Sequence, residues 1–424
     1  MDWEISLYRD RDHIGSLPSA TQNLIRKQKL LTNGGQNVSF VGLLFHEKFV
    51  SVFLPRNSKK AETDEDKNNL ASLILRTIQL YSKSFNSPLS IEDGELQNEV
   101  GGTSLSLISD LLNDYKKNGI YSKRSSVNTL NTGKPNWSKT ISRSVAYPNN
   151  SNYIYLDLHS NKKITQSICE VAKIHFSIIS EISDRFSVLL FGSVLRVTEN
   201  GITKPSTDSI EGQIHILNSE LRTTYSERDI QLIKSLIFYL KKIKGSSGRS
   251  MVIGIKHFHT VWEFMLLKTL ANTVNVNQLL PLPSYRLRDD TIKSAPLKGQ
   301  RLDVVLKRPN EDLYAVVDAK YYSAGSVSTA PGWPDLVKQF FYAKSLKEIL
   351  PSAIITNAFV FPRKEGNLKS AHMIDRVTGT VLSEEYVDIN CFYADPLEVM
   401  RHFVTNMFLH NLSQQLLVIE TEQS

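Results

Sequence analysis

The sequence predicts a multi-domain protein of the mixed α/β class, and three observations lead to this prediction. The chain has 424 residues, which is enough for two or three domains with separate cores. Segments with helical spacing alternate along it with short, β-rich apolar runs. Between residues 302 and 322, two such runs flank a turn at 309–312, which predicts a β-hairpin. We expect an N-terminal α+β domain over residues 1–225 and a second domain over residues 226–424.

Composition and charge narrow the class of protein. The 50 Lys and Arg residues exceed the 43 Asp and Glu residues, and the resulting net charge of +7 favours a polyanionic partner. The two cysteines, Cys169 and Cys391, lie far apart without metal-ligand spacing, which is typical of a reducing compartment. The charged N-terminus lacks the apolar core of a signal peptide, and no run reaches the length of a membrane span. We therefore expect a soluble, cytoplasmic protein that does not bind membranes.

The N-terminal half alternates strand and helix patterns. Residues 38–54 predict a hairpin around His46, and residues 70–85 show the apolar spacing of a helix. The elements expected after these are a linker over 87–102, a helix over 104–119 that stops at Gly119, a strand over 152–158, an amphipathic helix over 164–182, a β-leaning run over 188–198 and a helix over 223–245. The last helix has Ser226 and Asp229 in a capping-box pattern. The small, polar stretch 245–250 is expected to be a boundary or an exposed loop.

The segment from residue 116 to residue 143 carries seven basic residues and no acid. The basic residues are Lys116, Lys117, Lys123, Arg124, Lys134, Lys139 and Arg143, with Tyr115, Tyr121 and Trp137 interspersed. We expect this segment to be a loop. Two alternatives are open for its role: contact with a nucleic-acid phosphate backbone, which lysine, arginine and polar side chains commonly bind, or a solvated surface excursion.

The C-terminal half predicts elements on both sides of the hairpin. We expect a helix or helix pair over 252–274, a loop over 323–334, a helix over 335–350, strands over 353–362 and 385–394, and a helix over 395–417. Glu263 is the only acid between Met251 and Asp289. His257 and His259 form an H-x-H pattern that could ligate zinc on a strand, but no further ligands follow at suitable spacing. A polar or DNA-facing role is expected for these histidines.

The hairpin carries an acid in each of its two strands. Asp303 lies in the first run and Asp318 in the second, and Lys320 follows Asp318 by two residues, on the same face of the strand. If the chain turns near Asn310, Asp303 lies across from Asp318. Two adjacent carboxylates repel each other unless a hard cation neutralises them, and Mg²⁺ prefers carboxylate oxygen and water. These residues predict a metal site that acts on a phosphodiester; the alternative is a solvated strand end.

The same residues resemble a known nuclease signature. Asp303, followed fifteen residues later by Asp318-Ala319-Lys320, resembles the motif of the PD-(D/E)xK nucleases, with Leu302 in place of the usual proline. The resemblance implies that residues 226–424 contain a restriction-endonuclease-like core, which is a mixed sheet flanked by helices. The order helix, hairpin, helix, strand along this half is the order of that core.

This resemblance also implies supporting roles for three further residues. The Ala319 carbonyl and Glu263 would complete the shell of Mg²⁺, or of Mn²⁺ in its place. Gln339 and Tyr342 resemble the Q-then-Y pair of the RecB- and McrC-like branch, with a spacing that differs by one. In that branch the glutamine orients the site, which implies this role for Gln339.

Most of the chain resembles the LlaJI-type restriction endonucleases, which are relatives of McrC. The resemblance rests on FVGLLFHEKFVSVFLPR near the N-terminus, on NTGKPNWSKTI in the basic segment, and on FHTVWEFM, LDVVL and VDAKYY in the C-terminal half. It implies a bacterial, Mg²⁺-dependent DNA endonuclease subunit of an antiviral restriction system, which cleaves double-stranded DNA beside a McrB-like AAA+ GTPase motor. The chain has no G-x-x-x-x-G-K-[ST] pattern, so it is not expected to be the motor itself.

The resemblance leaves several alternatives open. In McrC-like proteins the N-terminal domain docks on the motor, so the basic segment could contact either DNA or the motor. Double-strand cleavage by a one-site nuclease implies self-association. Two other functions compete with a nuclease subunit: a non-catalytic adaptor that binds and stimulates the GTPase motor, and a stand-alone nuclease of DNA repair or transposition.

Overall fold

Strands from distant parts of the sequence share the first sheet. The computed structural model describes residues 4–46, 49–85, 99–100, 102–150, 152–198, 201–241, 250–295, 299–384 and 386–418. The sheet has the order β1 (Glu4–Arg9), β3 (Phe49–Leu54), β2 (Val41–His46), β10 (Ser250–Ile255) and β4 (Glu99–Val100). The hairpin predicted around His46 is confirmed, because β2 and β3 pair antiparallel. β10 pairs antiparallel with both β2 and β4.

This pairing determines how the chain divides. Residues 2–102 and 249–424 form one compact unit, which we call the larger unit, and residues 103–248 form the smaller unit. The division differs from the expected boundary at residue 225, because β10 completes a sheet whose other strands lie before residue 103. The assignment of partner or DNA binding to residues 1–225 stays a prediction.

Two helices pack against the first sheet. α1 (Ser19–Lys27) follows a 3₁₀ turn, η1 (Ile14–Ser16), and α2 (Asp64–Phe85) confirms the helix predicted over 70–85. The buried core contains Ile25, Leu30, Phe40, Leu44 and Phe53. Most of the linker expected over 87–102 lies outside the described residues, as does the stretch 245–250 apart from Ser250.

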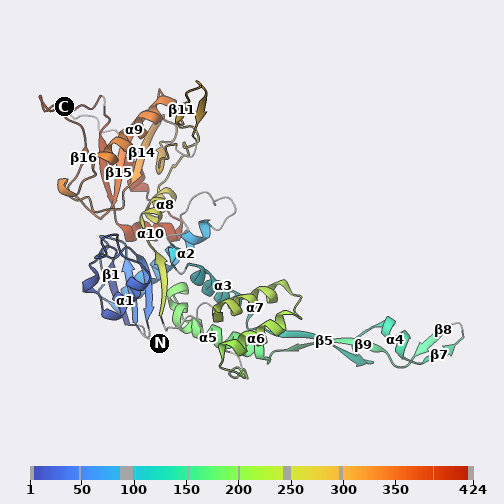
Figure 1. The fold of residues 1–424 in the computed structure, drawn as a ribbon. Coiled ribbons are helices and arrows are strands. Elements are labelled where there is room, and N and C mark those ends of the chain that lie inside the picture. The colour runs from blue at the N-terminus through green and yellow to red at the C-terminus, as the bar shows by residue number, and fades with distance from the viewer. Residues whose placement is uncertain are drawn as a thin grey trace. The chain divides into compact units, whose positions relative to one another are not determined.

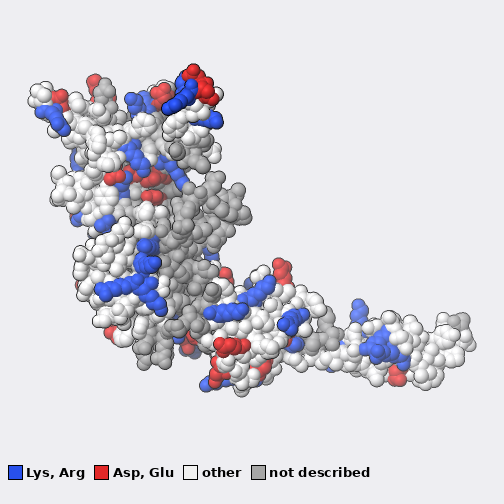
Figure 2. All heavy atoms as spheres, in the orientation of Figure 1, with Lys and Arg blue, Asp and Glu red and all other residues white. Residues whose placement is uncertain are grey.

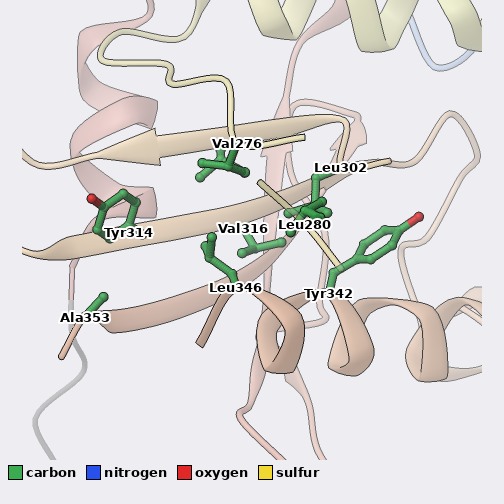
Figure 3. Close-up of a cluster of buried hydrophobic side chains, with 9 residues drawn as sticks. Val276, Leu280, Leu302, Tyr314, Val316, Tyr342, Leu346 and Ala353 are labelled. Carbon is green, nitrogen blue, oxygen red and sulfur yellow. The ribbon is translucent and has the colours of Figure 1, made fainter. Parts of the chain in front are cut away.

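The second sheet contains the predicted hairpin. Its order is β13 (Val304–Lys307), β14 (Leu313–Ala319), β15 (Ile354–Pro362), β17 (Ile389–Ala394) and β16 (Ser370–Ala371). β14, β15 and β17 are parallel, whereas β13 and β16 run antiparallel to their neighbours. α9 (Trp333–Ile349) connects β14 to β15, and its Tyr342 and Leu346 pack with Leu302 and Val316 in a buried cluster (Figure 3). The chain is therefore a multi-domain protein of the mixed α/β class.

Part of one predicted helix is a strand. The stretch 252–274 begins as β10 and becomes helical only at α8 (His259–Thr269), so His257 lies in the connection rather than on a strand. A short apolar run such as 251–255 has the same pattern in a strand and in a buried helix. Here Gly254 lies against β2 so closely that a Cβ atom would come within 2.5 Å of the Val41 carbonyl oxygen.

The predicted C-terminal helix is interrupted. Instead of one helix over 395–417, the structure has α10 (Pro396–Thr405) and α11 (His410–Leu416). The first ends because Asn406 adopts a left-handed conformation with φ of 54°. A short separate hairpin, β11 (Ser284–Arg286) and β12 (Ile292–Ser294), lies between α8 and β13 in the sequence.

The smaller unit consists of helices and an extended arm. The helices are α3 (Gly102–Asn118), α5 (Glu170–Phe191), α6 (Ile210–Leu221) and α7 (Glu227–Tyr239). The arm, residues 123–166, contains β5 (Lys123–Leu130), β6 (Lys134–Pro135), α4 (Trp137–Arg143), β7 (Ala146–Asn149), β8 (Asn152–Tyr155) and β9 (His159–Gln166). In Figure 1 the β5–β9 ribbon leads away from the helices to α4 and the β7–β8 hairpin.

Several predictions for the smaller unit are confirmed. α3 stops before Gly119, which has φ of 71°, and β8 confirms a strand within 152–158. Ser226 caps α7 by accepting a hydrogen bond from the Asp229 amide. None of the described helices is both long and apolar enough to span a membrane.

Three other predictions for this unit are wrong. The basic segment is not a loop but contains β5, β6 and α4; its polar strands lack the apolar alternation by which strands are identified. The helix expected over 164–182 begins only at Glu170, because residues 164–166 pair within β9. The run 188–198 is not a strand: its first residues end α5, and Gly192, with φ of 72°, terminates that helix.

A buried histidine makes the stability of the smaller unit depend on pH. His175 in α5 is fully buried, and its Nδ1 accepts a hydrogen bond of 3.0 Å from the Tyr121 amide. Burial lowers the pKa of His175 from 6.5 to about 4, so below pH 6.5 the unfolded chain gains a proton that the folded chain does not. We expect roughly 3 kcal/mol of stability to be lost between pH 6.5 and pH 4. Thermal unfolding of the whole protein should show a smaller pH dependence for His175→Gln; an equal dependence would contradict the prediction.

Candidate active site

The hairpin brings the two predicted acids together. β13 pairs with β14 from Val304 opposite Val317 to Lys307 opposite Tyr314, so the residues just beyond this ladder are Asp303 and Asp318. Asn310 in the connecting turn has φ of 62°. The Asp303 Oδ2 accepts a hydrogen bond of 3.1 Å from the Ala319 amide, which ties the first acid to the strand that carries the second.

The two carboxyl groups lie in a poorly solvated position. Asp318 is only 3% exposed, and its side chain hydrogen-bonds to that of Asp303. Burial raises the pKa of Asp303, and the hydrogen bond and charge of Asp318, followed by the charge of Glu263, raise it further. The pair therefore carries two negative charges only at a cost, which a bound cation would offset.

Lys320 lies between two carboxylates. Its Nζ is 2.6 Å from the Asp318 Oδ2 and 2.7 Å from the Asp335 Oδ1. Burial alone would lower the pKa of Lys320, but the two carboxylates outweigh it and raise that pKa, so the ammonium stays protonated. Asp335 also accepts a hydrogen bond of 3.1 Å from the Tyr322 hydroxyl. Sequence reasoning missed Asp335, because an acid in the first turn of a helix is ordinary there.

A cavity of about 990 Å³ opens beside the pair. Its lining includes Glu263 from α8, Asp303, and Lys338 and Tyr342 from α9. Glu263 and Asp303 therefore line the same cavity, and the role of Glu263 in a metal shell stays a prediction. Among the described residues, no three His, Cys, Asp or Glu side chains are arranged to hold one metal ion. Glu263 interacts with Asp303 through its charge rather than as a third member of such a cluster.

Lys338 adds a positive charge that the sequence did not reveal. Its side chain hydrogen-bonds to Tyr342, and its Nζ lies 5.4 Å from the centre of the Tyr342 ring. Burial alone would lower the pKa of Lys338, but Tyr342, Asp318 and Asp303 outweigh it and raise that pKa. In Figure 3 the Tyr342 hydroxyl points away from the buried cluster that its ring joins. One helix thus directs a cation and a hydroxyl to the cavity.

Gln339 is not brought to the carboxyl pair. It is fully buried, and its Nε2 donates to the carbonyl oxygens of Val316 and Ala358, at 3.1 Å each, and to the Asn357 Oδ1 at 2.6 Å. These contacts connect α9 to β14 and β15. Gln339 acts on the sheet that carries Asp318 rather than on the acids themselves.

The predicted DNA-binding residues all belong to the smaller unit. Lys134, Trp137 and Arg143 are exposed on the arm. Lys123 is ion-paired with Glu220 at 2.7 Å, and Lys116 lies over the Phe191 ring at 4.2 Å. Figure 2 shows lysine and arginine gathered around α4 with little acid beside them. Lys116 and Lys117, at the end of α3, are also exposed, whereas Lys123 and Lys139 are half-buried.

The donor set at the pair suits a hard cation. Mg²⁺ is commonly held by one or two carboxylates with water in its remaining positions, so Asp303 and Asp318 alone meet the need. Ala319 ends β14 directly after Asp318, and its amide contacts the Asp303 carboxylate. Carboxylate oxygens suit Mg²⁺ or Mn²⁺, whereas zinc in proteins is held mostly by sulfur and imidazole.

The chain is similar to restriction enzymes in a comparison with protein families and in a comparison with curated proteins. The family model described as LlaJI restriction endonuclease matches residues 40–387. The Bacillus subtilis (strain 168) protein "Type II restriction enzyme BsuMI component YdjA" is 23% identical over 344 residues, covering 78% of this chain and 73% of that protein.

Two solved assemblies from Thermococcus gammatolerans also match. A chain of the assembly of McrB AAA+ hexamers with bound McrC has a TM-score of 0.42 and 14% identity, covering 95% of this chain and 99% of that one. A chain of the McrBC complex has a TM-score of 0.29 and 12% identity, covering 62% of this chain and 85% of that one.

Proposed function

Because the chain belongs to the LlaJI restriction endonuclease family, we propose that it is the DNA-cleaving subunit of a restriction system, with a PD-(D/E)xK site at the end of the β13–β14 hairpin. The observation that carries this proposal is the contact of Asp303 and Asp318, with the Lys320 ammonium 2.6 Å from Asp318. The antiparallel hairpin that leads through α9 into a parallel β15 supports a restriction-endonuclease-like core.

The residues of the site divide the chemistry between them. Asp303 and Asp318 would hold Mg²⁺, with the Ala319 carbonyl beside them and Glu263 adding negative charge. The ion, when bound, polarises the phosphodiester and acidifies a water molecule. Lys320 stays protonated between two carboxylates, so its part is to stabilise the negative charge that develops on the phosphorane rather than to remove a proton.

A second subunit is part of the proposal. The Bacillus subtilis relative is named as a component of a restriction enzyme, which supports a multi-subunit system here. We propose a McrB-like AAA+ GTPase as the partner, since this chain has no phosphate-binding G-x-x-x-x-G-K-[ST] pattern. Two copies of the site would meet to cut both strands of DNA.

A plasmid cleavage assay tests this function. Purified protein is combined with plasmid DNA, GTP, Mg²⁺ and a candidate GTPase partner whose gene lies beside the gene of this protein. The GTP, the Mg²⁺ and the partner are each omitted in turn. Cleavage is expected with Mg²⁺ or Mn²⁺ and not with EDTA. If the complete mixture stimulates GTP hydrolysis but never cuts DNA, the chain is an adaptor and the nuclease proposal fails. Equal stimulation of the GTPase by the double variant D303A/K320A would show that the two roles are separable.

The arm is proposed to contact DNA through the cations of β6 and α4. We expect the variant K134A/K139A/R143A to bind DNA about tenfold more weakly and to lower the salt-dependence slope by about 2 to 3, because each phosphate contact releases about one counterion. Fluorescence anisotropy at several salt concentrations measures both quantities. The variant R26A/K27A/K29A, which removes the same charge at the end of α1, is the matched control. Unchanged DNA affinity with lost GTPase stimulation would assign the arm to the motor instead.

A further inference from the structure

The residue after Lys320 is anchored by the N-terminal sheet. Tyr321 is 8% exposed. Its carbonyl oxygen accepts a hydrogen bond of 2.9 Å from the Arg56 Nη1, and its hydroxyl accepts one of 3.1 Å from the Arg56 amide. The Arg56 guanidinium also lies 5.8 Å from the centre of the Tyr321 ring. One arginine, 265 positions earlier in the sequence, thus binds both the backbone and the side-chain end of Tyr321.

Neighbours of Arg56 extend the anchor to the next strand. Asn57 Nδ2 donates a hydrogen bond of 3.0 Å to the Pro362 carbonyl at the end of β15. β15 in turn accepts a hydrogen bond of 3.1 Å from the Lys320 amide through the Val360 carbonyl. The chain just after β3 therefore binds both the residue that follows Lys320 and the end of β15, the strand beside it.

Two further groups enclose Tyr321. Asp10 follows β1 and is 4% exposed. Its carboxyl group hydrogen-bonds to the Tyr321 side chain and accepts a hydrogen bond of 3.1 Å from the Phe40 amide. On the other side the Tyr321 ring packs against Phe258 and Trp262, with centroid distances of 5.5 and 6.4 Å. Trp262 precedes Glu263 on α8, so Tyr321 lies between the first sheet and the helix that carries Glu263.

We propose that Arg56 is a positioning residue for cleavage: by fixing Tyr321, it holds the Lys320 ammonium against Asp318 and Asp335. This inference rests on the proposed nuclease function. A doubly hydrogen-bonded, buried neighbour leaves the Lys320 backbone little freedom, and catalytic groups lose activity with displacements of about 1 Å. The N-terminal sheet is thereby a structural part of the cleavage site and not only a surface for partners.

Variants of the full chain test this role. Cleavage is measured with Mg²⁺ and the partner under conditions where wild-type protein cuts DNA, and unfolding temperatures are recorded for each variant. We expect Arg56→Ala to lower kcat about 10- to 100-fold, the range typical of residues that support a metal site from outside its ligand shell, with KM unchanged within about twofold. Arg56→Lys, which can still donate to the Tyr321 carbonyl, should recover part of kcat. Arg26→Ala, an exposed arginine of α1, should leave kcat unchanged.

A double-mutant cycle separates positioning from a general loss of structure. If Arg56 acts through Lys320, Arg56→Ala should lower kcat by less than about twofold in the Lys320→Ala background. An equal fold loss in both backgrounds, or a rise in KM with kcat unchanged, overturns the inference. If Arg56→Ala does not fold, the variants Arg56→Lys and Tyr321→Phe test the positioning role instead. A wild-type kcat in both of them overturns the inference.

The outcomes for the two proposals differ. Wild-type cleavage by Asp303→Ala removes the nuclease site itself. Loss of cleavage in Asp303→Ala together with wild-type kcat in Arg56→Ala removes only the positioning role.

Discussion

Asp303→Asn is expected to reduce DNA cleavage about a thousandfold or more while leaving the protein at least as stable as the wild type. The loss follows because an amide is a poor ligand for Mg²⁺, whose charge stabilisation contributes several kcal/mol to the transition state. The stability is expected to be kept or increased because burial and Asp318 raise the pKa of Asp303. A group whose pKa is raised by folding gives stability at low pH that is lost as pH rises, so its ionised form opposes folding at pH 8.

Unfolding temperatures measured with and without Mg²⁺ check both parts of this prediction. In EDTA at pH 8, Asp303→Asn should unfold at the same temperature as the wild type or higher. Added Mg²⁺ should stabilise the wild type by mass action and the variant much less. Asp312→Asn, an exposed acid in the turn of the same hairpin, is the control and should keep both cleavage and the Mg²⁺ response. A variant that cleaves like the wild type would remove Asp303 from the metal site.

Lys320→Met is expected to lose about a hundredfold to a thousandfold in cleavage and, unlike Asp303→Asn, to lose stability as well. The lost ammonium is the cation aimed at the developing phosphorane charge. It is also the partner of Asp318 and Asp335, and the side chains of Lys320 and Asp318 are only 12% and 4% exposed. Removing one member of a buried ion pair leaves an uncompensated charge, at a cost of about 3 kcal/mol.

Single-turnover cleavage and chemical unfolding measure the two effects of this variant. Lys307→Met, at the other end of the same hairpin and 39% exposed in its side chain, provides the matched change at a solvated position. Lys320→Arg keeps the charge but not the compact ammonium, so partial recovery of stability with little recovery of cleavage is expected. Full cleavage by Lys320→Met would show that the ammonium only balances the charge of its neighbours.

The site was predictable where its contacts are local. Asp303 and Asp318 lie on one hairpin, so a turn near Asn310 was enough to place them side by side. Glu263 was assigned by resemblance to the nuclease family, as the one acid on the preceding helix, and it lines the same cavity as Asp303. Gln339 was assigned by resemblance alone, and its contacts with Val316 and Ala358 show that a buried amide on α9 can serve the sheet instead.

Other parts of the site depend on contacts that leave no local pattern. Arg56 binds Tyr321 across 265 positions, and nothing near either residue in the sequence marks the pairing. The domain boundary was expected at residue 225 for the same reason. The apolar run of β10 gives no sign in the sequence that it pairs with β2. The arm was mistaken for a loop because a solvated ribbon needs no apolar face.

The pairing of β10 with β2 and β4 also determines the order in which parts of the nascent chain can fold. Strands β1, β2 and β3 emerge from the ribosome long before Ser250, and their sheet has an open edge until that residue arrives. Such widely separated partners make folding slow and leave an unpaired edge available to other chains in the meantime. Residues 103–248 form a compact unit of their own and precede β10 in the chain, so this unit can fold during the delay.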